Sequence, residues 1–220
     1  MDISRALAYI TDDEDWLQKV LIGGLLSLIP IVGQFWALGY ATVVLKNIIE
    51  GRESPLPDLI DEFGEKLIQG LLVSIMMVIY FLPLILISAI FGAGIGIATA
   101  GAADQDVAGI LAAILGSCLG LLVLALSIIA GLFIPYAWAK YAESGQFGAA
   151  FKLSPILNLI KANFGQTLLT LLVVIIVGVI ANSVGTAVCG IGVAFTGFYS
   201  YLVTSFLYGR LYLQAQAKTQ

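Results

Sequence analysis

The sequence predicts an all-α integral membrane protein, and two features support that prediction. The first is composition: 60% of the residues are hydrophobic and 11% are charged, whereas about 25% charged residues is normal in a soluble domain. The second is run length, since residues 67–98 carry no charged side chain. As a helix this run would reach about 48 Å, beyond a hydrocarbon core of about 30 Å. We therefore expect helices that enter the membrane.

The apolar runs group into three predicted helical hairpins, with about six membrane-entering helices in one membrane domain over residues 1–220. Pro30 lacks a backbone donor and Gly33 admits a turn, so the first hairpin is expected to bend there. Gly190 and Gly192 mark the expected turn of the third hairpin. The predicted order is hairpin 1 at 12–51, a linker at 52–66, hairpin 2 at 67–139, a linker at 140–166, hairpin 3 at 167–213 and a tail at 214–220.

Both linkers are expected to be amphipathic and to lie at the membrane interface. In the first linker, Asp58 is expected to cap a short helix that brings Leu59, Ile60 and Phe63 onto one face. The apolar pattern of residues 2–10 similarly predicts a short helix on the membrane surface.

The three hairpins show weak internal similarity. A shift of 47 residues places Lys19 on Lys66, and shifts of 96 and 159 place Tyr40 on Tyr136 and Tyr199. Each of the two lysines also has an acidic residue four positions before it, which predicts an i,i+4 ion pair. The hairpins are therefore interpreted as pseudo-repeats.

The distribution of charge agrees with this plan. If each hairpin returns to its starting side, all ten lysines and arginines lie on one side, and the outer loops around Asp104 and Gly190 contain none. The positive-inside rule makes the shared side, with both termini, cytoplasmic. One alternative is a single kinked crossing over 20–45, which places Arg5 and Lys19 opposite the other basic residues. A second is that the first hairpin is re-entrant.

Residues suited to catalysis or metal binding are sparse. The chain has no histidine, and no acidic residue lies within an apolar run. We therefore expect no catalytic residue, no metal site and no cofactor beyond bound lipid. Residues 12–15 (DDED) are interpreted as a helix start rather than a cation site. Gly92–Gly96 follows an apolar helix rather than a strand, which argues against a nucleotide-binding loop.

Two groups of residues are candidates for a functional role. A small-residue face predicts close packing of membrane helices; its members are Gly92, Gly96, Ala100, Ala112, Gly116 and Gly120. Tyrosines and tryptophans near the ends of the apolar runs predict an interfacial aromatic belt. The alternative is that the copied tyrosines and nearby polar groups line one cavity, comprising Gln34, Tyr40, Tyr136, Asn182 and Tyr199.

Residues 11–75 carry a set of short motifs: Asp15-Trp16, Gly23-Gly24, Ile29-Pro30-Ile31-Val32-Gly33, Gly39-Tyr40 and Pro55-Leu56-Pro57-Asp58. With these motifs the segment resembles the uncharacterised prokaryotic membrane proteins of domain-of-unknown-function family 4013. The resemblance implies a bacterial or archaeal multi-pass protein of the cytoplasmic (inner) membrane. It brings no catalytic residue to this chain.

The leading functional hypothesis is a non-enzymatic membrane scaffold or accessory subunit. Its expected partners are membrane lipids and other membrane protein subunits. Nucleic acid is not expected, because the chain has no basic block. The alternative is a carrier or passage for lipids or small uncharged solutes through a cavity between the hairpins.

Overall fold

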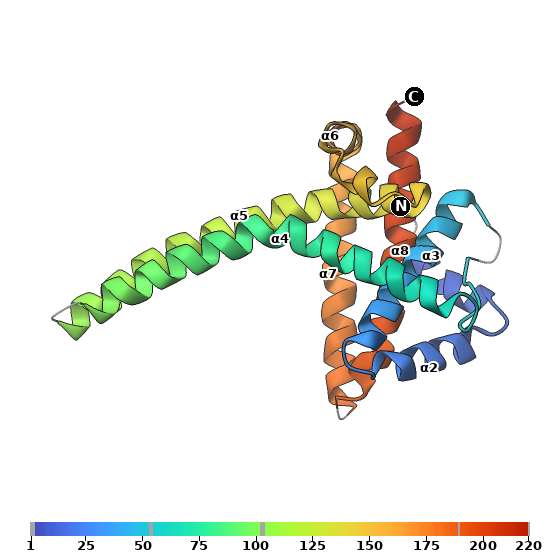
Figure 1. Ribbon diagram of the computed structural model, residues 1–220, viewed down its shortest axis with the longest axis horizontal. Coiled ribbons are helices and arrows are strands. Elements are labelled where there is room, and N and C mark those ends of the chain that lie inside the picture. The colour runs from blue at the N-terminus through green and yellow to red at the C-terminus, as the bar shows by residue number, and fades with distance from the viewer. Residues whose placement is uncertain (1–2, 53–54, 102–103, 189, 220) are drawn as a thin grey trace. The chain divides into compact units, whose positions relative to one another are not determined.

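A computed structural model describes residues 3–52, 55–101, 104–188 and 190–219, which form helices and turns with no strand among them (Figure 1). The elements are α1 (Ile3–Ala8), the 3-10 turn η1 (Tyr9–Asp12), α2 (Trp16–Ser27), α3 (Val32–Glu50), α4 (Phe63–Ala100), α5 (Gln105–Ser144), the 3-10 turn η2 (Phe147–Phe151), α6 (Leu153–Ala162), α7 (Phe164–Ala187) and α8 (Gly192–Thr219). The chain divides into unit 1, Met1–Met76 with Leu132–Gln220, and unit 2, Met77–Gly131.

Within the described residues, three helices are long and apolar enough to cross a membrane. They are α4 with 38 residues, α5 with 40 and α7 with 24. At 1.5 Å per residue even α7 reaches about 36 Å, which exceeds the hydrocarbon core. The helical composition and these three apolar helices confirm the predicted class, an all-α membrane protein.

The first apolar run is interrupted where the sequence predicted. Helix α2 ends at Ser27 and α3 begins at Val32, so Pro30 lies in the break. Ile31 has a φ of 66°, which is costly for a β-branched residue. The side chains around this turn are apolar and exposed, with Ile31 at 69%. At the other end of α3, Gly51 adopts a φ of 74° and ends the helix in a left-handed cap.

The first linker differs from the prediction. No helix forms at Asp58: the residues before Phe63 form bends and turns, and α4 begins at Phe63. Leu59 is buried while Ile60 is 84% exposed, so they do not share a face. The carbonyl groups of this segment accept hydrogen bonds from side chains instead of from its own backbone, as described below. In the second linker, by contrast, α6 is a helix that buries Ile156, Leu159 and Ile160.

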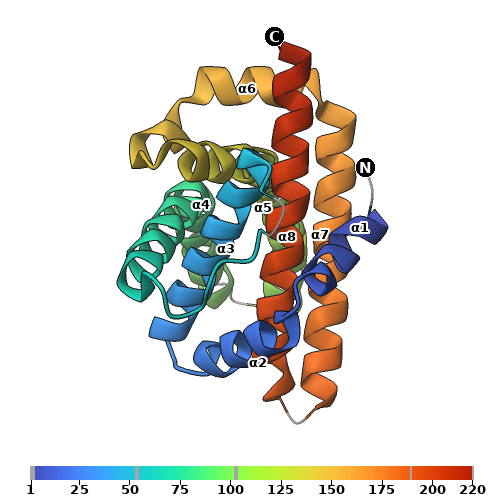
Figure 2. The ribbon, with the colours of Figure 1, turned by 90° about the vertical axis from the view of Figure 1, so that its right-hand side faces the viewer.

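Helix α8 is the centre of unit 1. It packs against α1, α2, α3, α6 and α7, and Figure 2 shows α7 and α3 running beside it. The core between α3 and α8 is aromatic: Trp36 stacks on Phe198 at 5.9 Å between ring centroids. Ser205 of α8 also donates to the carbonyl of Ala41 at 2.8 Å.

Two groups of residues that were expected at the membrane interface pack against other helices. Tyr40, Tyr136 and Tyr212 are completely buried, so these tyrosines belong to the protein core rather than to an aromatic belt. The N-terminal helix packs one side against the protein: Ala6 is completely buried, and the Tyr9 hydroxyl donates to the carbonyl of Leu202 at 2.7 Å. In both cases packing against neighbouring helices removes the side chains from lipid and water.

Close helix contacts occur at glycines outside the predicted small-residue face. A Cβ on Gly39 of α3 would overlap the carbonyl oxygen of Lys66, and one on Gly70 of α4 would overlap that of Phe35. Gly185 of α7 is in similarly close contact with the start of α8. These glycines let main chains approach as small residues do in membrane helix pairs.

In unit 2, segments of α4 and α5 run antiparallel beside each other (Figure 1). A cavity of about 370 Å³ lies between them, lined on one side by Phe91 and on the other by Leu119. The predicted small-residue face does not form this contact. A Cβ on Gly92, Gly96, Gly116 or Gly120 would meet no neighbouring atom within 4 Å, and Ala100 and Ala112 are exposed. Larger side chains, among them Phe91, Leu115 and Leu119, line the space between α4 and α5.

Candidate functional site

Four buried or half-buried side chains converge on the backbone of the segment between α3 and α4. We call this group the carbonyl clamp: its donors are Lys19, Tyr40, Asn47 and Lys66, and its acceptors are carbonyl groups within residues 55–61. The segment contains Pro55 and Pro57, which lack backbone donors. Side-chain donors therefore satisfy backbone groups that secondary structure would otherwise pair.

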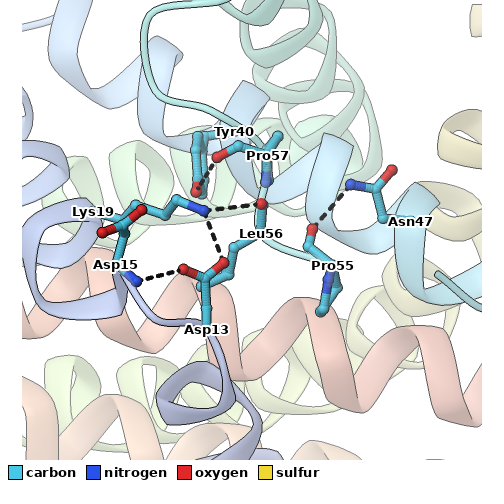
Figure 3. A network of polar contacts seen from close by, with 8 residues as sticks. All are labelled: Asp13, Asp15, Lys19, Tyr40, Asn47, Pro55, Leu56 and Pro57. Carbon is cyan, nitrogen blue, oxygen red and sulfur yellow. Dashed lines mark hydrogen bonds and ion pairs between the residues drawn. The ribbon is translucent and has the colours of Figure 1, made fainter. Parts of the chain in front are cut away.

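Lys19, at the start of α2, makes two contacts in the clamp. Its Nζ donates to the carbonyl of Leu56 at 3.3 Å and forms an ion pair with Asp13 at 2.7 Å (Figure 3). The Asp13 carboxylate also accepts the backbone N–H of Asp15 at 3.0 Å. The i,i+4 pair predicted between Asp15 and Lys19 is thus replaced by a pair with Asp13.

Helix α3 supplies two neutral donors. The Tyr40 hydroxyl donates to the carbonyl of Pro57 at 2.8 Å, and the Asn47 amide donates to that of Pro55 at 2.9 Å (Figure 3). Both residues are buried on the face of α3 that points toward the segment. They lie seven positions apart, which places them on one side of a helix.

Lys66, in the first turn of α4, is only 2% exposed. Its Nζ donates to the carbonyls of Asp58 and Asp61 and lies 5.7 Å from the centre of the Tyr40 ring. Carbonyl oxygens and an aromatic face both stabilise a buried cation. The expected i,i+4 partner, Glu62, has a φ of 52° and precedes the helix.

The clamp connects side chains of three helices to the main chain of one segment. Each of its donor groups is directed at a backbone carbonyl, and the donors come from α2, α3 and α4. It therefore holds α2, α3 and the beginning of α4 against the same segment. The sequence alignment with a 47-residue shift had already paired Lys19 with Lys66. It did not predict that both lysines donate to carbonyl groups of the same segment.

The predicted cavity residues do not meet at one place. The Tyr136 hydroxyl pairs with that of Thr167 at 2.7 Å, and the Tyr199 hydroxyl donates to the carbonyl of Leu7 at 2.9 Å. Gln34 donates to the carbonyl of Ser27, and Asn182 is exposed on α7. With Tyr40 in the clamp, the hydroxyls of the three copied tyrosines have separate partners.

Tyr199 instead lines an apolar cavity of about 460 Å³ in unit 1. The other lining residues come from α1, α2, α7 and α8: Leu7, Val20, Val177, Ile180, Ala181, Val184, Phe195 and Thr196. Aliphatic side chains dominate this lining, so the cavity suits a hydrocarbon chain better than a polar solute.

Residues 12–15 lie directly before α2. Asp13 pairs with Lys19, and Asp15 immediately precedes the first residue of α2. Within the described part of the chain, no three histidine, cysteine or acidic residues are grouped to hold a metal ion.

The buried helical core and the long apolar helices define an all-α membrane protein. The chain matches the family described as "Protein of unknown function (DUF4013)" over residues 22–190, and it belongs to that family. No curated protein and no solved structure matches it.

Proposed function

We propose that the protein is a non-enzymatic scaffold or accessory subunit of a larger membrane complex. The observation that carries this proposal is the unoccupied small-residue face of unit 2. Its four glycines have no neighbouring atom within 4 Å of a Cβ position, and its two alanines are exposed. In lipid, such faces gain van der Waals contact when another helix approaches closely. A helix of a partner subunit would supply that contact.

The proposed arrangement is three hairpins that return to a common cytoplasmic side in a prokaryotic inner membrane. Two contacts support it for the first hairpin: Lys19 before the turn bonds to Leu56 after α3, and Arg5 and Arg52 line one cavity. The exposed apolar turn around Ile31 suits the bilayer interior. Helix α2 has 12 residues, about 18 Å in length, so this hairpin is proposed to be re-entrant.

The pseudo-repeat also has local support. Ser27 donates to the carbonyl of Gly23 at 2.7 Å, and Ser74, 47 residues later, donates to that of Gly70 at 2.8 Å. Both glycines lie at close helix contacts. The repeated lysines of the clamp lie four residues before these glycines, so the two copies share a short structural motif.

Purification in mild detergent tests the scaffold proposal. We expect a defined larger assembly, and we expect Gly96→Leu or Gly116→Leu to release the partner because leucine fills the face. Leu124→Ile is the matched control, since Leu124 is exposed on α5 outside that face. A wild-type protein that remains a partner-free monomer, or equal release by the control variant, would contradict the proposal.

The second candidate is a carrier for lipids or small uncharged solutes, and the apolar cavity of about 460 Å³ favours it. In reconstituted vesicles, a carrier would show flux of a labelled lipid that Ala181→Trp blocks by filling the cavity. Flux unchanged by this variant would remove the cavity from any transport path.

A further inference from the structure

The three arginines of the chain line a single cavity. Arg5 lies on α1, Arg52 follows α3 and Arg210 lies on α8, and together they border a space of about 300 Å³. The chain contains no other arginine, and none of its seven lysines lines this space. Arginines from three distant parts of the sequence therefore line one site.

Charged side chains of both signs lie around this cavity. Asp12 lines it, and Glu50 accepts from Arg52 at 2.7 Å. The Arg210 guanidinium lies 5.3 Å from the centre of the Phe206 ring, and this contact orients the group. Arg52 and Arg210 are exposed, which leaves their remaining donors accessible to a ligand.

The cavity also has an apolar wall. Ile48, Phe206 and Leu213 line it, and the buried Tyr9 ring adjoins them. Because arginines and apolar side chains both line this space, it suits a ligand that has an anionic group and a hydrocarbon part. The same donors also suit a free anion that uses only the polar part.

We propose that this cavity binds a phosphate group, carried either by a lipid headgroup or by a free phosphate compound. The planar guanidinium presents paired donors that match phosphate oxygens, which a lysine ammonium does not. The site is independent of the proposed scaffold function, because it uses neither the small-residue face nor the apolar cavity.

Native mass spectrometry of the full-length protein in detergent tests this proposal with two matched lipids. Dilauroyl phosphatidic acid and dilauroyl glycerol differ by the phosphate group, and we expect the phosphatidic acid to bind at least about tenfold more tightly. Competition by inorganic phosphate would identify a free anion as a ligand, and its absence would identify the lipid headgroup. Equal binding of the two lipids would overturn the proposal.

Variants locate the binding within the protein. Arg210→Gln and Arg5→Gln should each weaken phosphatidic acid binding about tenfold, while Asp12→Asn should strengthen it by removing a negative charge. Lys161→Gln is the control, because Lys161 is exposed on α6 and the charge change is the same. An equal loss with Lys161→Gln would overturn the site. If either arginine variant fails to fold, Arg52→Gln and Asp12→Asn replace it in the test. Arg52→Gln should weaken phosphatidic acid binding and Asp12→Asn should strengthen it, and the absence of both changes would overturn the site.

Discussion

Gly39 of α3 and Gly70 of α4 lie at a helix crossing where each faces the other helix's main chain. A side chain at Gly39 would overlap the Lys66 carbonyl, and one at Gly70 would overlap the Phe35 carbonyl. The crossing lies one turn from the Lys66 side chain, so it also positions the clamp. Backbone contact of this kind leaves no flexible group that can move aside.

Alanine substitutions at this crossing should destabilise the protein. We expect Gly39→Ala and Gly70→Ala each to lower the free energy of unfolding by about 2 kcal/mol, because the new methyl group overpacks rigid backbone. Gly96→Ala is the control: its Cβ meets open space, so the better helix propensity of alanine should raise stability by about 0.5 kcal/mol. Denaturant unfolding in detergent, followed by circular dichroism, measures the three changes. Similar effects at all three positions would contradict the crossing.

Removing the Lys66 ammonium should loosen the segment between α3 and α4. Lys66→Met keeps the aliphatic length but leaves the Asp58 and Asp61 carbonyls without their donor, at a cost of about 3 kcal/mol. Hydrogen exchange across residues 55–62 should become faster. Lys46→Met should cost less than about 1 kcal/mol, because Lys46 forms an exposed pair with Glu50 at 3.9 Å. Unchanged exchange in Lys66→Met would show that the clamp is not needed to order this segment.

Labelling from each side of the membrane should find the two ends of the first hairpin together. In a background with both native cysteines replaced, Ser4→Cys and Glu50→Cys should react with an impermeant maleimide from the same side. Gln105→Cys should react from the other side, since residue 105 lies at the tip of the second hairpin. Reaction of positions 4 and 50 from opposite sides would support a single kinked crossing by residues 20–45.

Tyr9 should make stability depend on pH in the alkaline range. Burial, followed by the nearby Tyr40 and Tyr199, raises the pKa of Tyr9 well above its usual value of about 10. The unfolded chain therefore releases this proton first, so the stabilisation is complete below pH 10 and is lost as the pH rises toward the folded-state pKa. Tyr9→Phe lacks this ionisation. We expect the difference in melting temperature between wild type and Tyr9→Phe to shrink from pH 9 to pH 11.

A constant difference over that range would mean that Tyr9 ionises equally in both states. Thermal scans followed by near-ultraviolet circular dichroism provide the measurement. The Tyr9 hydroxyl donates to the Leu202 carbonyl, so the variant should be less stable by about 1 kcal/mol at neutral pH.

The sequence predicted the helical class and the break at Pro30 because charge, proline and glycine act locally. It did not predict which apolar residues face protein. Tyr40 and Tyr136 near run ends look like interfacial anchors, yet both are completely buried. In a chain this apolar, hydropathy does not separate core residues from lipid-facing ones.

The small-residue face and the carbonyl clamp also show that the sequence does not predict which residues meet. The regular spacing of Gly92, Gly96 and Gly116 predicted a packing face, whereas the close contacts within the chain occur at Gly39, Gly70 and Gly185. Which glycine lies at a crossing depends on how two helices meet, and that is set by distant residues. The two clamp lysines were aligned from the sequence, but their shared acceptors became apparent only in the fold.

The carbonyl clamp constrains the length of the connection between α3 and α4. Its acceptors lie within residues 55–61, and its donors come from helices on both sides of that segment. An inserted residue would shift the carbonyls out of register with the lysine, tyrosine and asparagine that reach them. An epitope or reporter fused into this short stretch would therefore disrupt folding, whereas the C-terminal end of α8, with Lys218 and Thr219 exposed, is better suited to carry one.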